Sequence, residues 1–245
     1  MNINGLHSAW EAHLKRYVRE LKADVFCMQE TRMGKDLDQY FVPGYEEYWC
    51  PSDRPGYAGV GLFTSRRTLS VIQGLGVPER ADEGRAVTLE LAGMYVVNVY
   101  APASGADLER LPEKVAWMNA LCRYVEYLEA RKPVVICGDL NIAGGVLDMP
   151  LGTDREQSAG NTSEEKEAFN RLVGMGYYDV WRLSHSGIRG VSWVPPGTNE
   201  RWAEQYGMRL DYFLVSEKLL GRVRSCEIQP QTAISDHRCV VLDMR

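Results

Sequence analysis

The sequence has no long apolar run and no cysteine pattern of the kind that disulfides or zinc require. No hydrophobic stretch approaches the ~20 residues of a membrane-spanning helix, and residues 1–5 show no secretory signal. None of the six cysteines forms a C-x-x-C pair, and several lie inside apolar runs, so we expect buried thiols in a reducing compartment. These absences favour a cytoplasmic protein with no membrane partner.

Positive charge is also scarce, because 28 Lys and Arg stand against 33 Asp and Glu, for a net charge of −5. Taken alone, this balance argues against a general nucleic-acid binder, since phosphate contacts need Lys and Arg. The objection is weak for a metal enzyme. Carboxylates that hold a divalent cation lower the net charge, and the bound cation then reverses the local field.

The length and composition are those of an ordinary globular protein. With 245 residues, 45% hydrophobic and 25% charged, the chain can bury one large core. It contains no internal repeat, low-complexity tract or long Gly/Ser linker, so we expect one domain over residues 1–245. No feature signals oligomerisation, and the prediction is a monomer.

Segments rich in Val, Leu, Tyr and Phe and bounded by Gly, Pro or charged residues recur along the chain and predict strands. They are Val25 to Met28, Gly59 to Thr64, Ala86 to Leu91, Met94 to Tyr100, Val134 to Gly138, Leu210 to Val215 and Cys239 to Met244. Helical spacing predicts helices over Ser8 to Leu21, Glu113 to Ala130 and Thr162 to Met175, the first capped by Ser8 and the last by a Thr162–Glu165 capping box. Many strands and few helices predict packed β-sheets with helices on the outer faces.

Three apolar strands end in side chains that can do chemistry. Residues 25–28 lead into Glu30, residues 96–99 into Tyr100, and residues 134–137 into Asp139 and Asn141. Rigid strands that deliver polar groups at their ends are a common way to build a site on the rim of a scaffold. Each residue alone has an ordinary explanation as a turn former, a solvated loop residue or a packing residue.

Two further polar elements lie near the C-terminus. Asp211 is embedded in an apolar strand, and an acid there needs a partner if it is buried. Asp236 and His237 stand just before the last strand, where a simple turn is the alternative interpretation.

Considered together and in order, the motifs are more specific than any one of them. They are N-x-N-G (Asn2 to Gly5), Q-E (Gln29, Glu30), N-x-Y-x-P (Asn98 to Pro102), G-D-x-N (Gly138 to Asn141), S-W (Ser192, Trp193), R-x-D-Y (Arg209 to Tyr212) and S-D-H (Ser235 to His237). This set resembles the exonuclease III / abasic-site endonuclease family of the endonuclease–exonuclease–phosphatase superfamily. G-D-x-N and S-D-H are shared across the superfamily, whereas N-x-N-G-L, Tyr100, Trp193 and the loop 54–60 point to its DNA-repair branch.

The resemblance implies a fold and a metal centre. The fold is α/β, a four-layer α/β/β/α sandwich of two packed mixed β-sheets, DNase I-like. Glu30 is the foremost candidate ligand for Mg2+, with Mn2+ as an alternative, because hard cations prefer oxygen ligands. The resemblance adds the remaining candidate metal-site residues, and whether they hold one metal or two stays open: Asn2, Asn4, Asp139, Asn141, Asp236 and His237.

Catalytic roles follow from the same resemblance and from the chemistry of an anionic phosphodiester. Asp139 is the candidate general base for water, and Asn141 would orient the water and the phosphate. His237 would hydrogen-bond the scissile phosphate, while Asp211 would fix its tautomer and favour its cationic form. Tyr100 would donate a hydrogen bond to the phosphate or stabilise the leaving group.

Substrate contacts are implied as well. Trp193 and Met208 match positions that line the pocket for a base-less sugar, while Tyr57, Arg85 and Arg209 are candidates for contacts with the DNA backbone. The expected partner is double-stranded DNA with abasic sites or 3′ ends. The loop 101–106 lacks the Asn and Arg that some abasic endonucleases place there, so the balance of endonuclease and exonuclease action stays open.

Two alternatives remain. One is another phosphodiesterase of the superfamily. The other is a catalytically inactive nucleic-acid-binding regulator on the same fold, which should have lost Glu30, Asp139 or His237, yet all three are present. A departure from the family keeps this alternative open, because members usually carry a short apolar strand before N-x-N-G and here Met1 stands directly on the motif.

Overall fold

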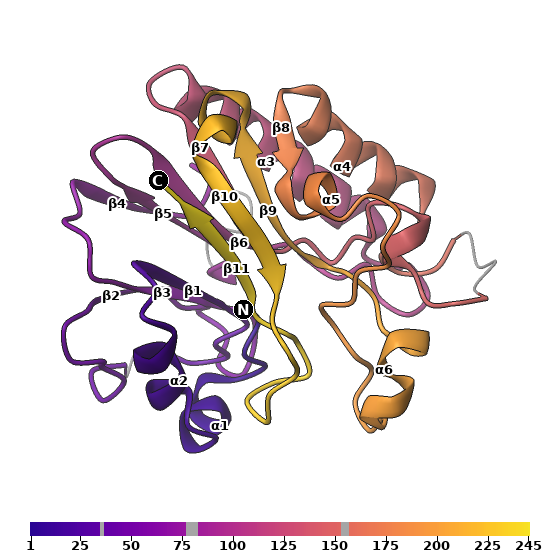
Figure 1. Cartoon of the computed structure of the whole chain (residues 1–245), viewed down its shortest axis with the longest axis horizontal. Helices are drawn as coiled ribbons and strands as arrows, with labels where there is room; N and C mark the ends of the chain where they lie inside the picture. The colour runs from indigo at the N-terminus through magenta and orange to yellow at the C-terminus, as the bar shows by residue number, and fades with distance from the viewer. Residues whose placement is uncertain (35–36, 77–82, 153–156) are drawn as a thin grey trace.

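A computed structural model describes residues 1–34, 37–76, 83–152 and 157–245 of the chain. Figure 1 shows two β-layers packed against each other, with helices on both outer sides. The strands are β1 (Val25–Gln29), β2 (Glu46–Cys50), β3 (Val60–Thr64), β4 (Ser70–Gln73), β5 (Ala86–Glu90), β6 (Tyr95–Tyr100), β7 (Val134–Asp139), β8 (Tyr177–Asp179), β9 (Asp211–Ser216), β10 (Val223–Ile228) and β11 (Val240–Met244). The α-helices are α1 (Leu6–Glu11), α2 (Leu14–Leu21), α3 (Leu111–Glu129), α4 (Ser163–Gly174), α5 (Val180–Ser184) and α6 (Glu200–Tyr206).

The first layer is a six-stranded sheet of order β4-β5-β6-β7-β9-β8. It is mixed, because β6 and β7 run parallel and its other neighbouring strands run antiparallel. The register sets Tyr100 opposite Asp139, and Asp139 opposite Asp211. Three polar side chains from adjacent strands therefore meet at one edge of this sheet.

The second layer consists of two antiparallel pieces, a three-stranded one of order β1-β3-β2 and a two-stranded one formed by β10 and β11. The predicted four-layer α/β sandwich is therefore confirmed, although only the six-stranded sheet is mixed. Apolar residues such as Leu62 on β3 and Leu89 on β5 fill the space between the layers. Helices α3 and α4 cover the free face of the six-stranded sheet, and α1 and α2 cover the three-stranded piece.

A buried amide joins the two layers close to the sheet edge where Tyr100, Asp139 and Asp211 meet. Asn98 on β6 is fully buried and donates to the backbone carbonyls of Met28 at 3.0 Å and Gly61 at 2.9 Å. It also accepts a hydrogen bond from Gln29 Nε2 at 2.6 Å. Because buried amides are costly unless paired, these three contacts set how β1 and β3 sit against β6.

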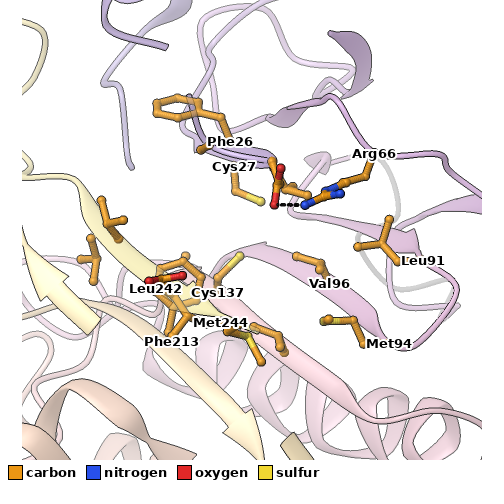
Figure 2. Close-up of a pocket in the computed structure, with 18 of the residues that line it drawn as sticks. Phe26, Cys27, Arg66, Leu91, Met94, Val96, Cys137, Phe213, Leu242 and Met244 are labelled. Carbon is orange, nitrogen blue, oxygen red and sulfur yellow. Dashed lines mark hydrogen bonds and ion pairs between the residues drawn. The ribbon is translucent and has the colours of Figure 1, made fainter. Parts of the chain in front are cut away.

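A cavity of about 700 Å³ lies between the layers where β1 and β11 face each other across a gap. Figure 2 shows Phe26 and Cys27 on one side of this space, and Cys137, Phe213, Leu242 and Met244 on the other. Within the described residues, the outer edge of β1 is paired only near its end, through a parallel bridge between Asn2 and Gln29. The lining shown in Figure 2 is largely apolar, so this space is a feature of the core rather than a catalytic site.

Two of the three predicted helices are present with shifted ends as α3 and α4, whereas the short helices α5 and α6 were not predicted. The expected helix from Ser8 to Leu21 is two helices, because His13 adopts a left-handed conformation with φ of 73° between α1 and α2. The Ser8 cap is also wrong, since α1 begins at Leu6 and the Ser8 hydroxyl donates to the Gly5 carbonyl. The capping box of Thr162 and Glu165 is confirmed at the start of α4.

Four strands escaped prediction, namely β2, β4, β8 and β10. Each is short or carries charged and polar residues on an exposed side, so its composition differs little from that of a loop. Their pairing partners, rather than their own residues, make them strands. All the predicted strands are present with end shifts of one residue.

Candidate active site

Asp139 is the last residue of β7 and the centre of the polar cluster. The preceding Gly138 has φ of +127°, and a Cβ atom there would lie 2.1 Å from the Val99 carbonyl oxygen. Only glycine permits β7 to approach β6 this closely. The G-D pair therefore delivers the Asp139 carboxylate to the sheet edge at a set position.

Two side chains and one backbone N–H surround the Asp139 carboxylate, which is only 1% exposed. Asn2 Nδ2 donates to its Oδ2 at 3.0 Å, and the Asn141 backbone N–H donates to its Oδ1 at 2.8 Å. His237 Nε2 lies 4.0 Å from Oδ2. Burial and the nearby Asp211 carboxylate raise the pKa of Asp139, and His237 and the two hydrogen bonds counter them only in part.

His237 is held by Asp211 on its other side. Its Nδ1 lies 2.9 Å from Asp211 Oδ2, which also accepts a hydrogen bond from Ser192 Oγ at 2.6 Å. Burial lowers the pKa of His237, but the Asp211, Asp139 and Asp236 carboxylates outweigh it and raise that pKa to about 9. His237 is thus cationic at neutral pH, and its charge keeps the pKa of Asp211 below the usual value despite burial.

Glu30 lies on the opposite side of Asn2. Asn2 Nδ2 donates to Glu30 Oε2 at 2.9 Å, so one amide joins the Glu30 and Asp139 carboxylates. Arg32 forms an ion pair with Glu30 Oε1, a contact that the sequence analysis did not foresee. Burial, with Glu30 and Asp139 nearby, raises the pKa of Tyr100 well above its usual value, so its hydroxyl stays protonated as a hydrogen-bond donor.

Asp236 completes the rim. Its Oδ1 accepts from Asn4 Nδ2 at 3.0 Å and its Oδ2 from Trp193 Nε1 at 3.0 Å. The Asn4 Oδ1 atom is buried and has no hydrogen-bond partner within the described residues. An orphaned amide oxygen close to the Asp236 carboxylate suits a hard divalent cation, which is coordinated by oxygen atoms.

Trp193 and Met208 are paired beside His237. Their backbones exchange two hydrogen bonds of 2.9 Å, and Trp193 also bridges to His237. The Trp193 and His237 rings lie 6.5 Å apart and both residues are at least partly buried. The structure thus brings together two predicted substrate-pocket residues and a predicted catalytic residue from separate segments.

Tyr57 stands in a group of arginines next to Tyr100. Its hydroxyl accepts from Arg85 at 2.8 Å and from Arg110 at 2.7 Å, and Arg54 lies over its ring at 5.1 Å. Arg85 is only 4% exposed and lies over the Tyr100 ring at 5.0 Å, so it supports both tyrosines from behind. Arg54 and Arg110 are more accessible cations of this group, and neither was predicted as a contact residue.

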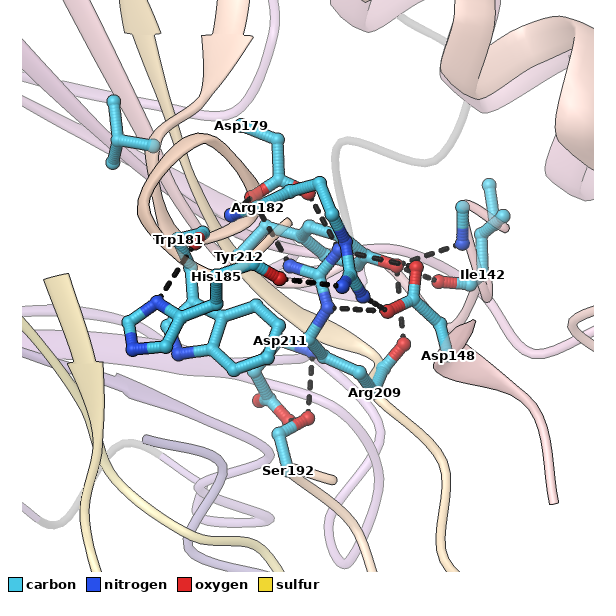
Figure 3. A network of polar contacts seen from close by, with 12 residues as sticks. Ile142, Asp148, Asp179, Trp181, Arg182, His185, Ser192, Arg209, Asp211 and Tyr212 are labelled. Carbon is cyan, nitrogen blue, oxygen red and sulfur yellow. Dashed lines mark hydrogen bonds and ion pairs between the residues drawn. The ribbon is translucent and has the colours of Figure 1, made fainter. Parts of the chain in front are cut away.

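The predicted DNA contact of Arg209 is wrong. Figure 3 shows its guanidinium between the carboxylates of Asp148 and Asp179, and it is 1% exposed. It bonds Asp148 at 2.6 Å and Asp179 at 2.5 Å, and lies over the Tyr212 ring at 4.4 Å. Because the guanidinium is enclosed on all sides, it is not accessible to a phosphate. Arg209 instead holds the segment before Asp211 in place.

Ser192 is a contributor that the motif analysis noted without a role. Its hydroxyl accepts from the Leu210 and Asp211 backbone N–H groups at 2.9 and 3.0 Å while it donates to the Asp211 carboxylate. The serine thereby fixes the start of β9 relative to the His237 segment. A serine beside a tryptophan has no local signature of such a role, because its partner is 19 positions away.

Packed sheets between outer helices, with carboxylates, amides and a His–Asp pair at one rim, define a class of hydrolases that cleave phosphoesters. Residues 1–237 match the Endonuclease/Exonuclease/phosphatase family, and the chain belongs to that family. The family is generally dependent on divalent metal ions, and Asp139, Asp211 and His237 place ligand-type atoms within 4.8 Å of one another.

Within the described residues, no helix is long and apolar enough to cross a membrane.

The relatives include an exodeoxyribonuclease and an abasic-site endonuclease. The chain is 35% identical over 240 residues to an exodeoxyribonuclease of Bacillus subtilis, covering 96% of this chain and 94% of the relative. It is 31% identical over 252 residues to a DNA-(apurinic or apyrimidinic site) endonuclease of Dictyostelium discoideum, covering 99% and 69% of the two chains. The crystal structure of an AP endonuclease from Leishmania major superimposes with a TM-score of 0.90 at 25% identity, covering 100% and 86%.

Proposed function

We propose that the protein is a Mg2+-dependent nuclease of DNA repair that hydrolyses phosphodiester bonds 5′ to abasic sites and at 3′ ends. The observation that carries this proposal is the buried Asp139 carboxylate between Asn2, Asn141 and the His237–Asp211 pair. It combines a base, amide groups and a cation at one sheet edge, which is what attack of water on an anionic phosphate demands.

The residues that would hold the metal are Glu30, Asn2, Asn4 and Asp236. A bound Mg2+ would polarise a non-bridging phosphate oxygen and neutralise charge that develops in the transition state. Asn2 links this group to Asp139 through its two hydrogen bonds of 2.9 and 3.0 Å. Mn2+ has the same preference for oxygen ligands and is expected to substitute.

Asp139 is the proposed general base. Its raised pKa makes it a stronger base than an exposed aspartate while it remains able to release the proton. His237, cationic at neutral pH, would hold a phosphate oxygen through Nε2, because Nδ1 is engaged by Asp211. Tyr100 would donate its hydroxyl proton in a hydrogen bond to the phosphate, since its raised pKa keeps it neutral.

The substrate is proposed to be double-stranded DNA, cut by a monomer. Trp193 pairs with both Met208 and His237, and a sugar without its base would be placed next to it during cleavage. Tyr57, with Arg54 and Arg110 around it, would position the backbone without reading sequence. All six cysteines are free thiols, which fits a reducing compartment such as the cytoplasm.

A duplex oligonucleotide with one abasic-site analogue tests the proposal. The wild type is expected to cut 5′ to the site with Mg2+ and not with EDTA, and Glu30→Ala and Asp139→Ala are each expected to lose cutting. Digestion of undamaged 3′ ends in the same reactions measures the balance of exonuclease action. If the wild type binds the duplex yet cuts neither substrate with Mg2+ or Mn2+, the inactive regulator replaces the nuclease as the better account.

A further inference from the structure

Lys114 on α3 and Glu165 on α4 form a buried ion pair behind the active-site edge. Both residues are 0% exposed, and Lys114 Nζ lies 2.7 Å from Glu165 Oε1. Removing two charges from water is costly, and an apolar pair of similar volume often folds as well or better. Stability alone therefore does not account for charged side chains at this place.

Lys114 reaches the backbone of a proposed active-site residue. Its ammonium donates to the Asn141 carbonyl oxygen as well as to Glu165. Asn141 has φ of +52°, a left-handed conformation that is uncommon for a residue other than glycine. Its own backbone N–H donates to Asp139 and its side-chain amide donates to the Ala101 carbonyl at 3.0 Å. The ammonium thus holds the carbonyl of Asn141, the residue whose backbone N–H donates to Asp139 and whose side-chain amide donates to Ala101.

Glu165 gathers two other loops onto the same point. Its carboxylate accepts from the Ser104 hydroxyl, from Gly160 N–H at 3.1 Å and from Thr162 N–H at 2.9 Å. The loop of Gly160 packs on Asn141, because a Cβ atom on Gly160 would lie 3.0 Å from the Asn141 carbonyl oxygen. One buried carboxylate therefore connects the segments around residues 104 and 160, and Lys114 links it to Asn141.

We infer that the Lys114–Glu165 pair is a positioning element for the reaction. It holds the side-chain amide of Asn141 in place without touching the substrate. The inference rests on the proposed function, because its main readout is DNA cleavage. A positioning role predicts a loss in kcat with little change in KM, since the proposed DNA contacts of Arg54, Tyr57 and Trp193 lie on other segments.

Lys114→Met keeps most of the side-chain stem and removes both hydrogen bonds, and Glu165→Gln is the milder change. Each is expected to lower kcat by about 10–100-fold, the range seen when partners that orient active-site ligands are removed, while KM stays within about threefold. Leu128→Ala is the matched control, because Leu128 lies on the same helix and is 1% exposed in the core. At a temperature well below unfolding, Leu128→Ala is expected to retain kcat.

A double-mutant cycle with Asn141→Ala separates positioning from general destabilisation. If the ion pair acts through the Asn141 amide, Lys114→Met should lower kcat much less in the Asn141→Ala background than in the wild type. An equal factor in both backgrounds, or a loss confined to KM, would overturn the inference. Failure of the wild type to cut would count against the proposed function instead.

Nuclear magnetic resonance tests the inference even if the wild type does not cut DNA. The side-chain amide protons of Asn141 donate to the Ala101 carbonyl, so their resonance should be shifted and slow to exchange in the wild type. Lys114→Met is expected to move this resonance and speed its exchange, while Leu128→Ala leaves it in place. An unchanged Asn141 side-chain resonance in a folded Lys114→Met protein would contradict the inference whatever the enzyme cuts.

Discussion

His237 Nδ1 lies 2.9 Å from the Oδ2 atom of Asp211, and the two residues are both nearly buried. Replacing Asp211 with Asn keeps the volume but removes the charge that raises the pKa of His237. We predict that Asp211→Asn lowers kcat by roughly 10²–10⁴-fold, the range for general acid–base groups and their orienting partners. Steady-state cleavage of the abasic duplex measures it, with Asp243→Asn, an exposed aspartate, as the control. Full activity of Asp211→Asn would show that His237 needs no cationic form.

Arg209 is predicted to matter for stability rather than for DNA binding. Arg209→Met would remove the cation that the Asp148 and Asp179 carboxylates share. Because Asp148 keeps its ion pair with Arg182, we expect the lower end of the range for a broken buried pair, about 3 kcal/mol of the free energy of unfolding. Urea unfolding of the variant measures this loss. In conditions where the variant is folded, the slope of log K for DNA binding against log salt should equal the slope of the wild type. A flatter slope would restore Arg209 as a phosphate contact.

Arg54 is predicted to behave in the opposite way. It is exposed and lies over Tyr57 at 5.1 Å, so Arg54→Gln should leave stability within about 0.5 kcal/mol of the wild type. If it meets a phosphate, the slope of log K against log salt becomes less steep by about 1. Titrations of a fluorescent abasic duplex at several salt concentrations test this. Arg131→Gln is the control, because Arg131 pairs with Tyr127 on another part of the surface.

Glu165 predicts a pH dependence of stability. Burial raises its pKa, but Lys114 with the hydrogen bonds from Ser104 and Thr162 outweighs burial and lowers the pKa below its ordinary 4.5. A carboxyl whose pKa is lower in the folded state stabilises above its unfolded pKa, and the benefit disappears as pH falls through the folded pKa. The advantage of the wild type over Glu165→Gln in urea should therefore be full at pH 7 and shrink below about pH 4.5. A constant difference over that range would contradict the prediction.

A strand added between β1 and β11 is predicted to raise the thermal stability of the protein. Met1 and Ile3 already pair with Gln29 in the parallel sense, and within the described residues β11 pairs with β10 alone. A short N-terminal extension of alternating Val and Ser should continue this pairing and fill part of the cavity of about 700 Å³. We predict that the Tm of the extended protein rises by about 2–4 °C for each kcal/mol added to the free energy of unfolding. A Gly-Ser extension of equal length is the control, and equal melting temperatures for both would refute strand addition.

Local sequence determined much of the fold and pointed to several residues of the candidate site. Apolar runs ending in Glu30, Tyr100 and Asp139 predicted strands that carry polar groups to a rim, because alternation and strand ends are local properties. The capping box at Thr162 was equally predictable, since both of its partners lie within one turn.

Tertiary structure decided which polar residues serve the site and which serve the scaffold. Arg209 and Arg85 look alike in sequence, yet one is enclosed by two carboxylates and the other supports Tyr57 and Tyr100. Asn2 and Asp139 are 137 positions apart and become neighbours only through the pairing of β1 with Asn2 and the packing of the layers. Sheet register and layer packing are cooperative properties of the whole chain, so a residue's own neighbours in sequence carry no record of such partners.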